Sequence, residues 1–347
     1  MLVFVRIKIR KEFFIKSFSL GATRAISLLF GLMISALVSS SLMATDCTSD
    51  YIELNSQAGI DSFQSKYGGG GTCDTVPGTL RIGGPDVVDL TPLSALTTIR
   101  DQFQIRQTIN LVDLDGLSAL TSVGGDQTDA AGSFYIFDNA ALTNFTGLSG
   151  LASVGGTLFI SDNPALTSVD GMSSLTSVHG LGIGSNDSLT SLSGISALVS
   201  GSVSWSLGIG GNGALTNLDA LSALTSVGGL SITHNYALAN LDGLSNLTSV
   251  GSNLIVEYNS QLKSINGMNS LRSVGNDFLL IDNNLLSNCT ILTRLLDQID
   301  DYEPGPGPGE AGIPDIGGSA TLQDNSSGCN SIELILDTLF KDGFEGL

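Results

Sequence analysis

The chain has 347 residues and a formal net charge of −19, with 43 Gly and only 6% aromatic residues. Residues 1–44 hold six of the fourteen basic residues, and without them 8 basic and 32 acidic residues remain, a charge of about −24. This acidity argues against binding to nucleic acid or anionic lipid, since Lys and Arg supply most of the affinity for both.

The N-terminal segment has the pattern of an export signal. Basic residues from Arg6 to Arg24 precede an apolar run over residues 25–38, which is short for a membrane span, and small residues follow. We expect a signal peptide over residues 1–44, with an uncleaved anchor as the alternative. A second apolar run of 18 residues does not occur, so we expect no transmembrane span in the mature chain and a secreted or cell-surface location.

A repeat of the form Leu-x-x-Val-x-Gly-x-Leu-x-Ile-x-x-Asn-x-x-Leu-x-x-Leu-x-x-Leu fills the middle of the chain. A fixed period of this length predicts a solenoid, in which each turn stacks on the one before. We therefore expect an all-β solenoid of roughly eight turns of 23–24 residues. The repeating Asn residues, spaced by 23 to 26 positions, are Asn139, Asn163, Asn186, Asn212, Asn235, Asn259 and Asn283.

One turn shows how each part is expected to lie. Leu158 and Ile160 should point inward from a strand, with Phe159 and Ser161 facing solvent. From Leu166 an apolar residue recurs at every third position, which favours short extended pieces joined at corners. Each repeating Asn is interpreted as a rung of a buried ladder, whose amide bonds the backbone of its own and neighbouring turns.

Caps are expected at both ends, because an open solenoid end exposes core and strand edges. We assign residues 45–79 to an N-terminal cap, 80–289 to the repeats, and 290–347 to a C-terminal cap helix, a Pro/Gly linker and an acidic tail. Helical spacing over residues 291–299 predicts the capping helix, and residues 303–314 form the linker. A second short helix is predicted over residues 332–340.

The four cysteines flank the repeats, two on each side. Three pairings are possible, and we favour Cys47–Cys73 and Cys289–Cys329, because seven stacked turns hold the two pairs roughly 30 Å apart. A metal site is the weaker interpretation, since the chain has no Cys-x-x-Cys and no neighbouring His pair; we expect no metal and no cofactor. His179 and His234 are expected to be isolated surface residues.

The outward strand positions carry aromatic and aliphatic residues at both ends and Gly in the centre, a shallow trough between apolar shoulders. Exposed apolar patches are typical of contact sites. We expect this face to bind a glycan or an extended peptide, with Tyr135, Phe137 and Phe159 stacking on it and Ile255 and Glu257 at the far shoulder; alternatively, the C-terminal segment covers part of the face. Trp205, the only Trp, lies in an insertion that is a candidate binding loop.

Two alternative functions are weaker. A polysaccharide-degrading enzyme (a lyase or glycosidase) needs paired carboxylates, and Asp138, Asp162 and Asp282 each precede a repeating Asn. The middle turns lack an acid there, and the repeats from Asn139 to Asn259 contain no Lys or Arg. Recurrent Thr-Ser pairs raise the second alternative, ice or mineral binding, although the Thr-x-Thr of ice binders is missing.

The repeat pattern resembles the receptor L-domain family over residues 80–299. The resemblance implies a right-handed β-helix and an extracellular role in binding a ligand, without catalysis. The chain has no cysteine-rich module, membrane span or kinase, so receptor signalling is not carried over. Residues 339–345, Leu-Phe-Lys-Asp-Gly-Phe-Glu, look like a short tail of exported proteins of Gram-negative bacteria. We expect an exported bacterial module for binding or adhesion, with a glycan or protein as its partner.

Overall fold

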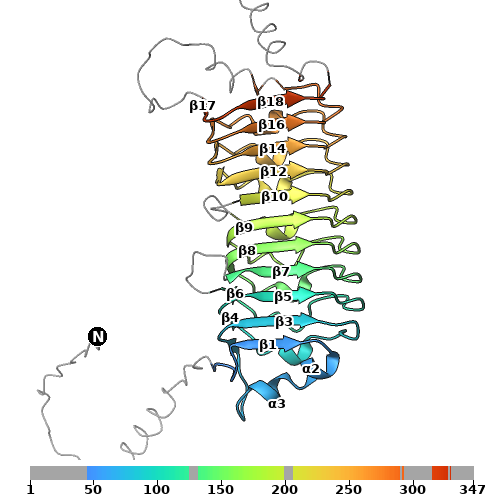
Figure 1. Cartoon of the computed structure of the whole chain (residues 1–347), viewed down its shortest axis with the longest axis vertical. Coiled ribbons are helices and arrows are strands. Elements are labelled where there is room, and N and C mark those ends of the chain that lie inside the picture. Colours follow the sequence, from blue (N-terminus) through green and yellow to red (C-terminus); the bar gives the residue numbers. More distant parts are fainter. Residues whose placement is uncertain are drawn as a thin grey trace, which may run out of the picture. The chain divides into compact units, whose positions relative to one another are not determined.

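The computed structural model describes residues 45–124, 132–198, 206–289, 291–292, 315–326 and 329, which form an all-β coil of parallel strands (Figure 1). The expected export signal, Trp205, the linker over residues 303–314 and the helix over residues 332–340 lie outside them, as does most of the helix over residues 291–299. Within the described part, no helix has the length and apolar character needed to cross a bilayer.

Most described strands form one long parallel sheet in which each turn adds a strand beside the previous one. Its main row is β1 (Tyr51–Leu54), β3 (Thr79–Gly83), β5 (Phe103–Arg106), β7 (Phe134–Phe137), β8 (Ser153–Ser161), β9 (Ser177–Gly184), β10 (Ser206–Gly210), β12 (Gly229–Thr233), β14 (Leu254–Glu257), β16 (Phe278–Ile281) and β18 (Ala320–Gln323). Shorter strands β2 (Thr75–Val76), β4 (Thr98–Ile99) and β6 (Ser122–Val123) join this sheet, and β11 (Ser226–Val227), β13 (Ser249–Val250), β15 (Ser273–Val274) and β17 (Asp315–Ile316) form a second.

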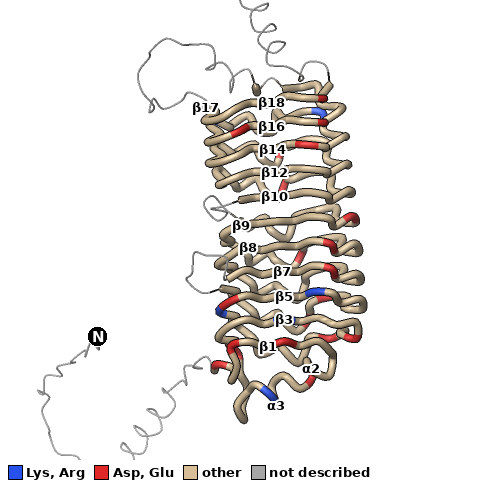
Figure 2. Tube along the Cα trace, viewed as in Figure 1, with Lys and Arg blue, Asp and Glu red and all other residues tan. Residues whose placement is uncertain are grey.

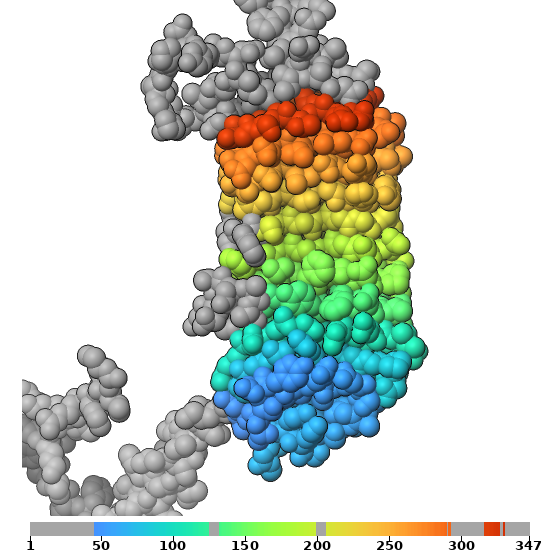
Figure 3. Space-filling model, in the orientation of Figure 1, coloured from blue at the N-terminus to red at the C-terminus, as the bar shows by residue number. Residues whose placement is uncertain are grey.

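The core is a continuous stack of aliphatic side chains inside the coil. Leu158 of β8 is in register with Leu181 of β9. Leu181 is in turn in register with Leu207 of β10, and Leu207 with Leu230 of β12. All four are at most 2% exposed, which confirms the predicted alignment. Figure 3 shows the sequence colours following one another in layers, so each turn contacts the turns before and after it. Stability therefore depends on neighbouring turns, since one turn alone buries too little apolar surface.

The segments with an apolar residue at every third position form short 3₁₀ helices, a detail that the sequence did not predict. Three residues per turn place residues i and i+3 on the same side, and Leu192, Ile195 and Leu198 are accordingly buried. Gly194 lies so close to the previous turn that a Cβ would overlap the carbonyl oxygen of Val169. The 3₁₀ helices are η1 (Thr91–Leu93), η3 (Thr146–Leu148), η4 (Ser193–Ile195), η5 (Asp219–Leu221), η6 (Asp242–Leu244) and η7 (Asn266–Met268).

The seven repeating Asn residues are fully buried and linked through their side chains. Asn163 is representative: its Nδ2 donates to the carbonyl of Ser161 at 2.8 Å, to that of Ile136 at 3.1 Å and to Oδ1 of Asn186 at 3.2 Å. The ladder starts at Thr108, whose hydroxyl donates to Asn139 at 2.8 Å. Its links between successive turns are Asn139–Asn163, Asn163–Asn186, Asn186–Asn212, Asn212–Asn235, Asn235–Asn259, Asn259–Asn283 and Asn283–Asn325.

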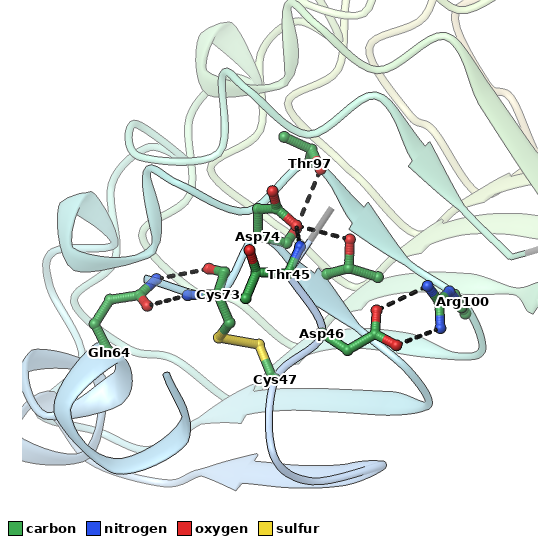
Figure 4. The surroundings of a disulfide bond; sticks show 9 residues. Thr45, Asp46, Cys47, Gln64, Cys73, Asp74, Thr97 and Arg100 are labelled. Carbon is green, nitrogen blue, oxygen red and sulfur yellow. Dashed lines mark hydrogen bonds and ion pairs between the residues drawn. A yellow bond between two sulfur atoms is a disulfide. The ribbon is translucent and has the colours of Figure 1, made fainter. Parts of the chain in front are cut away.

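At the N-terminal end, β1, α2 (Gln57–Asp61) and α3 (Phe63–Tyr67) form the first turn, closed by the Cys47–Cys73 disulfide (Figure 4). The amide of Gln64 donates to the carbonyl of Cys73 at 3.0 Å and accepts from its N–H at 2.9 Å. An ion pair at 2.7 Å joins Arg100 of the next turn to Asp46. The segment predicted as a cap thus already supplies a strand of the sheet.

At the C-terminal end, the solenoid continues beyond residue 289, where the repeats were expected to end. Strands β17 and β18 add a further turn, and Asn325 extends the ladder. Nδ2 of Asn325 also donates to the carbonyl of Cys329, the partner of Cys289 in the second disulfide. Both disulfide pairings confirm the prediction.

Candidate functional site

The outward face of the long sheet carries two columns of side chains in strict parallel register. In the first column Tyr135 lies beside Phe159 and Phe159 beside Gly182. In the second, Phe137 lies beside Ser161. Figure 2 shows few Lys and Arg along the coil, with several acidic residues near the C-terminal ends of the strands. The strand face itself is thus largely uncharged in its middle turns.

Three of the predicted ligand-binding residues lie together. The rings of Tyr135 and Phe159 are 6.3 Å apart between centroids and tilted by 59°. Phe159 is 38% exposed, whereas Tyr135 and Phe137 are half-buried. Ser161 was expected to face solvent but is only 5% exposed. Ser161 is a small residue in register with the much larger Phe137 of the adjacent strand.

Beside Phe159 the face is hollowed by about 190 Å³. Glycines form the floor, and their missing side chains leave the space open. The ring of Phe159 leans over Gly182, since a Cβ there would lie 2.7 Å from its Cδ2, whereas a Cβ on Gly208 would meet nothing within 4 Å. The hollow is lined by Phe159, Gly182, Ile183, Gly184, Gly208, Ile209, Gly210, Ser231 and Thr233.

Of the predicted ligand-binding residues that the structure describes, only Phe159 lines the hollow. Ile255 and Glu257 are half-buried on β14, four strands from Phe159, which corresponds to about 19 Å. They stand beyond the far edge, next to Ser231 and Thr233 in register. These two hydroxyl residues do line the hollow and were not chosen from the sequence.

Toward the N-terminus, the same columns continue into a polar cluster that sequence reasoning missed. Arg106 is in register with Phe137 and pairs with Glu53 at 3.4 Å. Arg81 donates to the hydroxyl of Tyr51 at 3.0 Å and lies over its ring at 5.3 Å. Gln104 and Arg106 are in register with Tyr135 and Phe137 but precede them by 31 residues. The usual spacing of 23 to 26 residues therefore does not find them, because an insertion lies before β7.

At the C-terminal ends of the strands, the residue before each ladder Asn has a left-handed backbone, with φ between 51° and 70°. His234 and Tyr258 occupy this position in consecutive turns, and their rings stack at 4.6 Å. Tyr236 meets His234 edge-on at 6.2 Å. His234, expected to be isolated, is therefore part of an exposed aromatic group. A hydrogen bond to the carboxylate of Asp282 raises the pKa of Tyr258, and the charges of Asp282, Glu257 and Asp324 add to the effect.

The Asp residues considered for catalysis share this backbone position. Asp138 and Asp162 lie one turn apart, each with φ near 55°. Short polar residues tolerate this conformation better than most, which is a structural reason for an acid there. Within the described residues, no three His, Cys, Asp or Glu side chains gather into a group that could hold a metal ion.

The recurrent Thr residues have structural partners. Thr121, Thr167 and Thr190 each donate the side-chain hydroxyl to a carbonyl of the preceding turn, at 3.0 to 3.2 Å. Thr176 and Thr248 do the same. Hydroxyl protons used in this way do not organise water on the surface, which weakens the case for ice binding.

Residues 72–179 match the family described as Receptor L domain. The matched segment includes Tyr135, Phe137 and Phe159, and it confirms the resemblance indicated by the repeats. The family is one of non-catalytic, ligand-binding domains. A search of the curated proteins finds no significant match to the chain.

Proposed function

We propose that this chain, with a receptor L domain at residues 72–179, is an exported binding module that recognises an extracellular glycan through the outward face of its long sheet. The hollow beside Phe159 carries the proposal, because it combines an exposed aromatic ring, a glycine floor and two hydroxyl residues. A protein ligand is the alternative occupant of the same face.

A sugar ring suits this combination of groups. Its C–H face packs on an aromatic ring such as Phe159, and its hydroxyls can bond Ser231 and Thr233 at the opposite side. The hollow is smaller than the roughly 300–1,000 Å³ of sites that enclose a drug-sized ligand, so it fits one ring of a longer chain. Affinity per site should be low, with Kd in about the micromolar to millimolar range.

The charge of the protein narrows the ligand class. With about −24 on the mature chain, the surface disfavours anionic polysaccharides and favours neutral or cationic ones. Export would follow from the predicted signal over residues 1–44, with the solenoid and its caps forming the mature protein. The two disulfides suit an oxidising compartment.

The test is a glycan array probed with the protein expressed from the full-length chain, followed by calorimetry on the best ligand. Two variants should lower affinity by roughly tenfold or more, equivalent to about 1.4 kcal/mol. Phe159→Ser removes the stacking ring. Gly208→Val fills the hollow at a position where a side chain has free space and where the strand accepts a β-branched residue.

Val112→Ser is the matched control, because Val112 is 50% exposed but lies outside the strand face. It should bind within about twofold of the unmodified protein. If both face variants bind as tightly as this control, the hollow is not the binding site. Binding to a protein ligand alone would favour the alternative.

A further inference from the structure

A second surface lies at the corner that follows the strands, formed by His234, Tyr236 and Tyr258; we call it the aromatic corner. Tyr236 is 52% and Tyr258 42% exposed, so neither ring contributes fully to the core. His234 stacks on Tyr258 with an interplanar angle of 27° and meets Tyr236 at 80°. The ring of Tyr236 is therefore nearly perpendicular to that of His234, whereas the Tyr258 ring is close to parallel with it.

The backbone beneath this group is costly for a residue as large as Tyr258. His234 and Tyr258 have φ of 58° and 56°, a conformation that His adopts more readily than most residues but that a bulky residue such as Tyr rarely adopts. Other turns place Asp162, Ser185 or Gly211 at the same position. Tyr258 is 42% exposed, so it is not held there as a core residue, and residues held in unfavourable conformations are often found at binding sites.

Carboxylates surround the aromatic corner. Asp282, Glu257 and Asp324 lie close enough to the Tyr258 hydroxyl for their charges to act on it, and Asp282 has the largest effect. Among the described residues, no ion pair neutralises any of the three; the ion pairs there join Arg100 to Asp46 and Arg106 to Glu53. Nor do the three carboxylates converge into a group able to hold a metal ion.

We propose that the aromatic corner binds the protonated amine of an amino sugar within an oligosaccharide. Ring faces attract organic cations, and nearby carboxylates add to that attraction. The ring of the sugar supplies the C–H surface that packs on Tyr236 or Tyr258. Thr233, which immediately precedes His234, lines the hollow beside Phe159, so neighbouring rings of one chain can reach both surfaces.

The inference goes beyond the proposed function, because the three rings of the aromatic corner are not among the residues that line the hollow. The probes are a glucosamine tetramer, in buffer that keeps its amines protonated, and the N-acetylglucosamine tetramer, which has the same rings without the charge. Calorimetry on the full-length protein should give an affinity for the glucosamine tetramer roughly tenfold higher than for the acetylated one. Added salt should reduce that difference.

Two variants test the residues. Tyr258→Asn removes the ring and introduces a residue that tolerates the left-handed backbone, so the fold should be retained. Asp282→Asn removes the carboxylate at an equivalent backbone position. Each should lower affinity for the glucosamine tetramer by roughly fivefold or more. Asp162→Asn makes the same change at the same position of another turn and should stay within about twofold.

Several results would overturn the inference: no measurable binding of the glucosamine tetramer, equal binding of the acetylated tetramer, or equal losses in Asp282→Asn and Asp162→Asn. A lysine tetramer that binds as tightly as the sugar would reject the saccharide. The two proposals fail separately, since Phe159→Ser reports on the hollow and Tyr258→Asn on the aromatic corner. Thermal melting of each variant, monitored by circular dichroism, shows that a loss of binding is not a loss of fold.

Discussion

The side-chain amide of Asn283 donates a hydrogen bond of 3.2 Å to Oδ1 of Asn325, although 42 residues separate the two in the chain. The backbone N–H of Asn283 donates to the same oxygen at 3.1 Å. One buried side chain thus satisfies two donors of the preceding turn and holds the last strand in register.

Replacement of Asn325 by Ala should therefore loosen the last turn. It removes the acceptor of the buried backbone N–H of Asn283 and the donor to the carbonyl of Leu280, whereas the side-chain amide of Asn283 keeps its bonds to the carbonyls of Val256 and Ile281; the cost should be about 2–4 kcal/mol. Hydrogen exchange of the β18 amides should accelerate accordingly. Asn284→Ala, which truncates the exposed neighbour of Asn283, is the control and should change stability by less than about 0.5 kcal/mol. Equal effects of the two substitutions would contradict the role given to the ladder.

Replacement of Gly by Ala at the left-handed position before a ladder Asn should destabilise the protein. Gly211 has φ of 70°, so Gly211→Ala should lower the free energy of unfolding by about 1–2 kcal/mol. Gly213, two residues later, lacks a positive φ, and a Cβ there meets only a carboxylate oxygen at 3.9 Å. Gly213→Ala should be neutral or slightly stabilising. Chemical denaturation of both variants measures the difference.

The two disulfides should protect opposite ends of the coil. By loop-closure entropy, the bridges across 26 and 40 residues contribute about 3.5 and 4 kcal/mol. Because each turn contacts only its neighbours, replacement of Cys289 and Cys329 by Ala should speed hydrogen exchange in β16 and β18 and leave β1 and β3 protected. The Cys47 and Cys73 double variant should show the reverse. Uniform acceleration along the coil in either variant would argue against local stabilisation.

The last turn should also weaken in acid. Asp277 accepts hydrogen bonds from the backbone N–H and the hydroxyl of Ser319, both at 2.8 Å, and these bonds lower the pKa of Asp277 below its ordinary value of 3.8. A carboxyl group whose pKa is lower in the folded state stabilises that state above the unfolded pKa. This contribution is lost as the pH falls through 3.8 and below the folded pKa.

The protection factor of the Ser319 amide, which is its exchange rate relative to an unstructured amide at the same pH, measures this loss when it is compared between pH 6 and pH 3. In Asp277→Asn the acid-dependent part of the change should disappear, because the side chain no longer titrates. Asp187→Asn removes an exposed carboxylate from a different turn and should leave the pH dependence at Ser319 as it is. An unaltered pH dependence in Asp277→Asn would assign the effect to another group.

Features that repeat could be predicted from the sequence. Leu158 and Leu181 recur at fixed spacing, so their alignment in the core follows from the period. The disulfides followed from the position of each Cys pair at one end of the array. The 3₁₀ helices were missed because an apolar residue at every third position constrains which side chains are buried and leaves the backbone path open.

Features that depend on a side chain's neighbours could not be predicted in this way. Ser161 occupies an outward position beside Phe137, yet it is only 5% exposed, which the alternation of one strand does not predict. The turn that contains Asn325 escaped notice because 42 residues, and not 23 to 26, separate that Asn from Asn283. Ser231 and Thr233 gain their importance from the hollow beside them, which exists only once the glycines of β9 and β10 lie side by side.

The ladder has a consequence for how such a protein can change over generations. From Asn139 to Asn325, each turn presents the same buried amide to the turns on either side, so the junctions between these turns are equivalent. A gene segment encoding one unit can then be duplicated or deleted in frame with the remaining turns still joined. The length of the coil, and with it the area of its outward face, is open to selection independently of the fold.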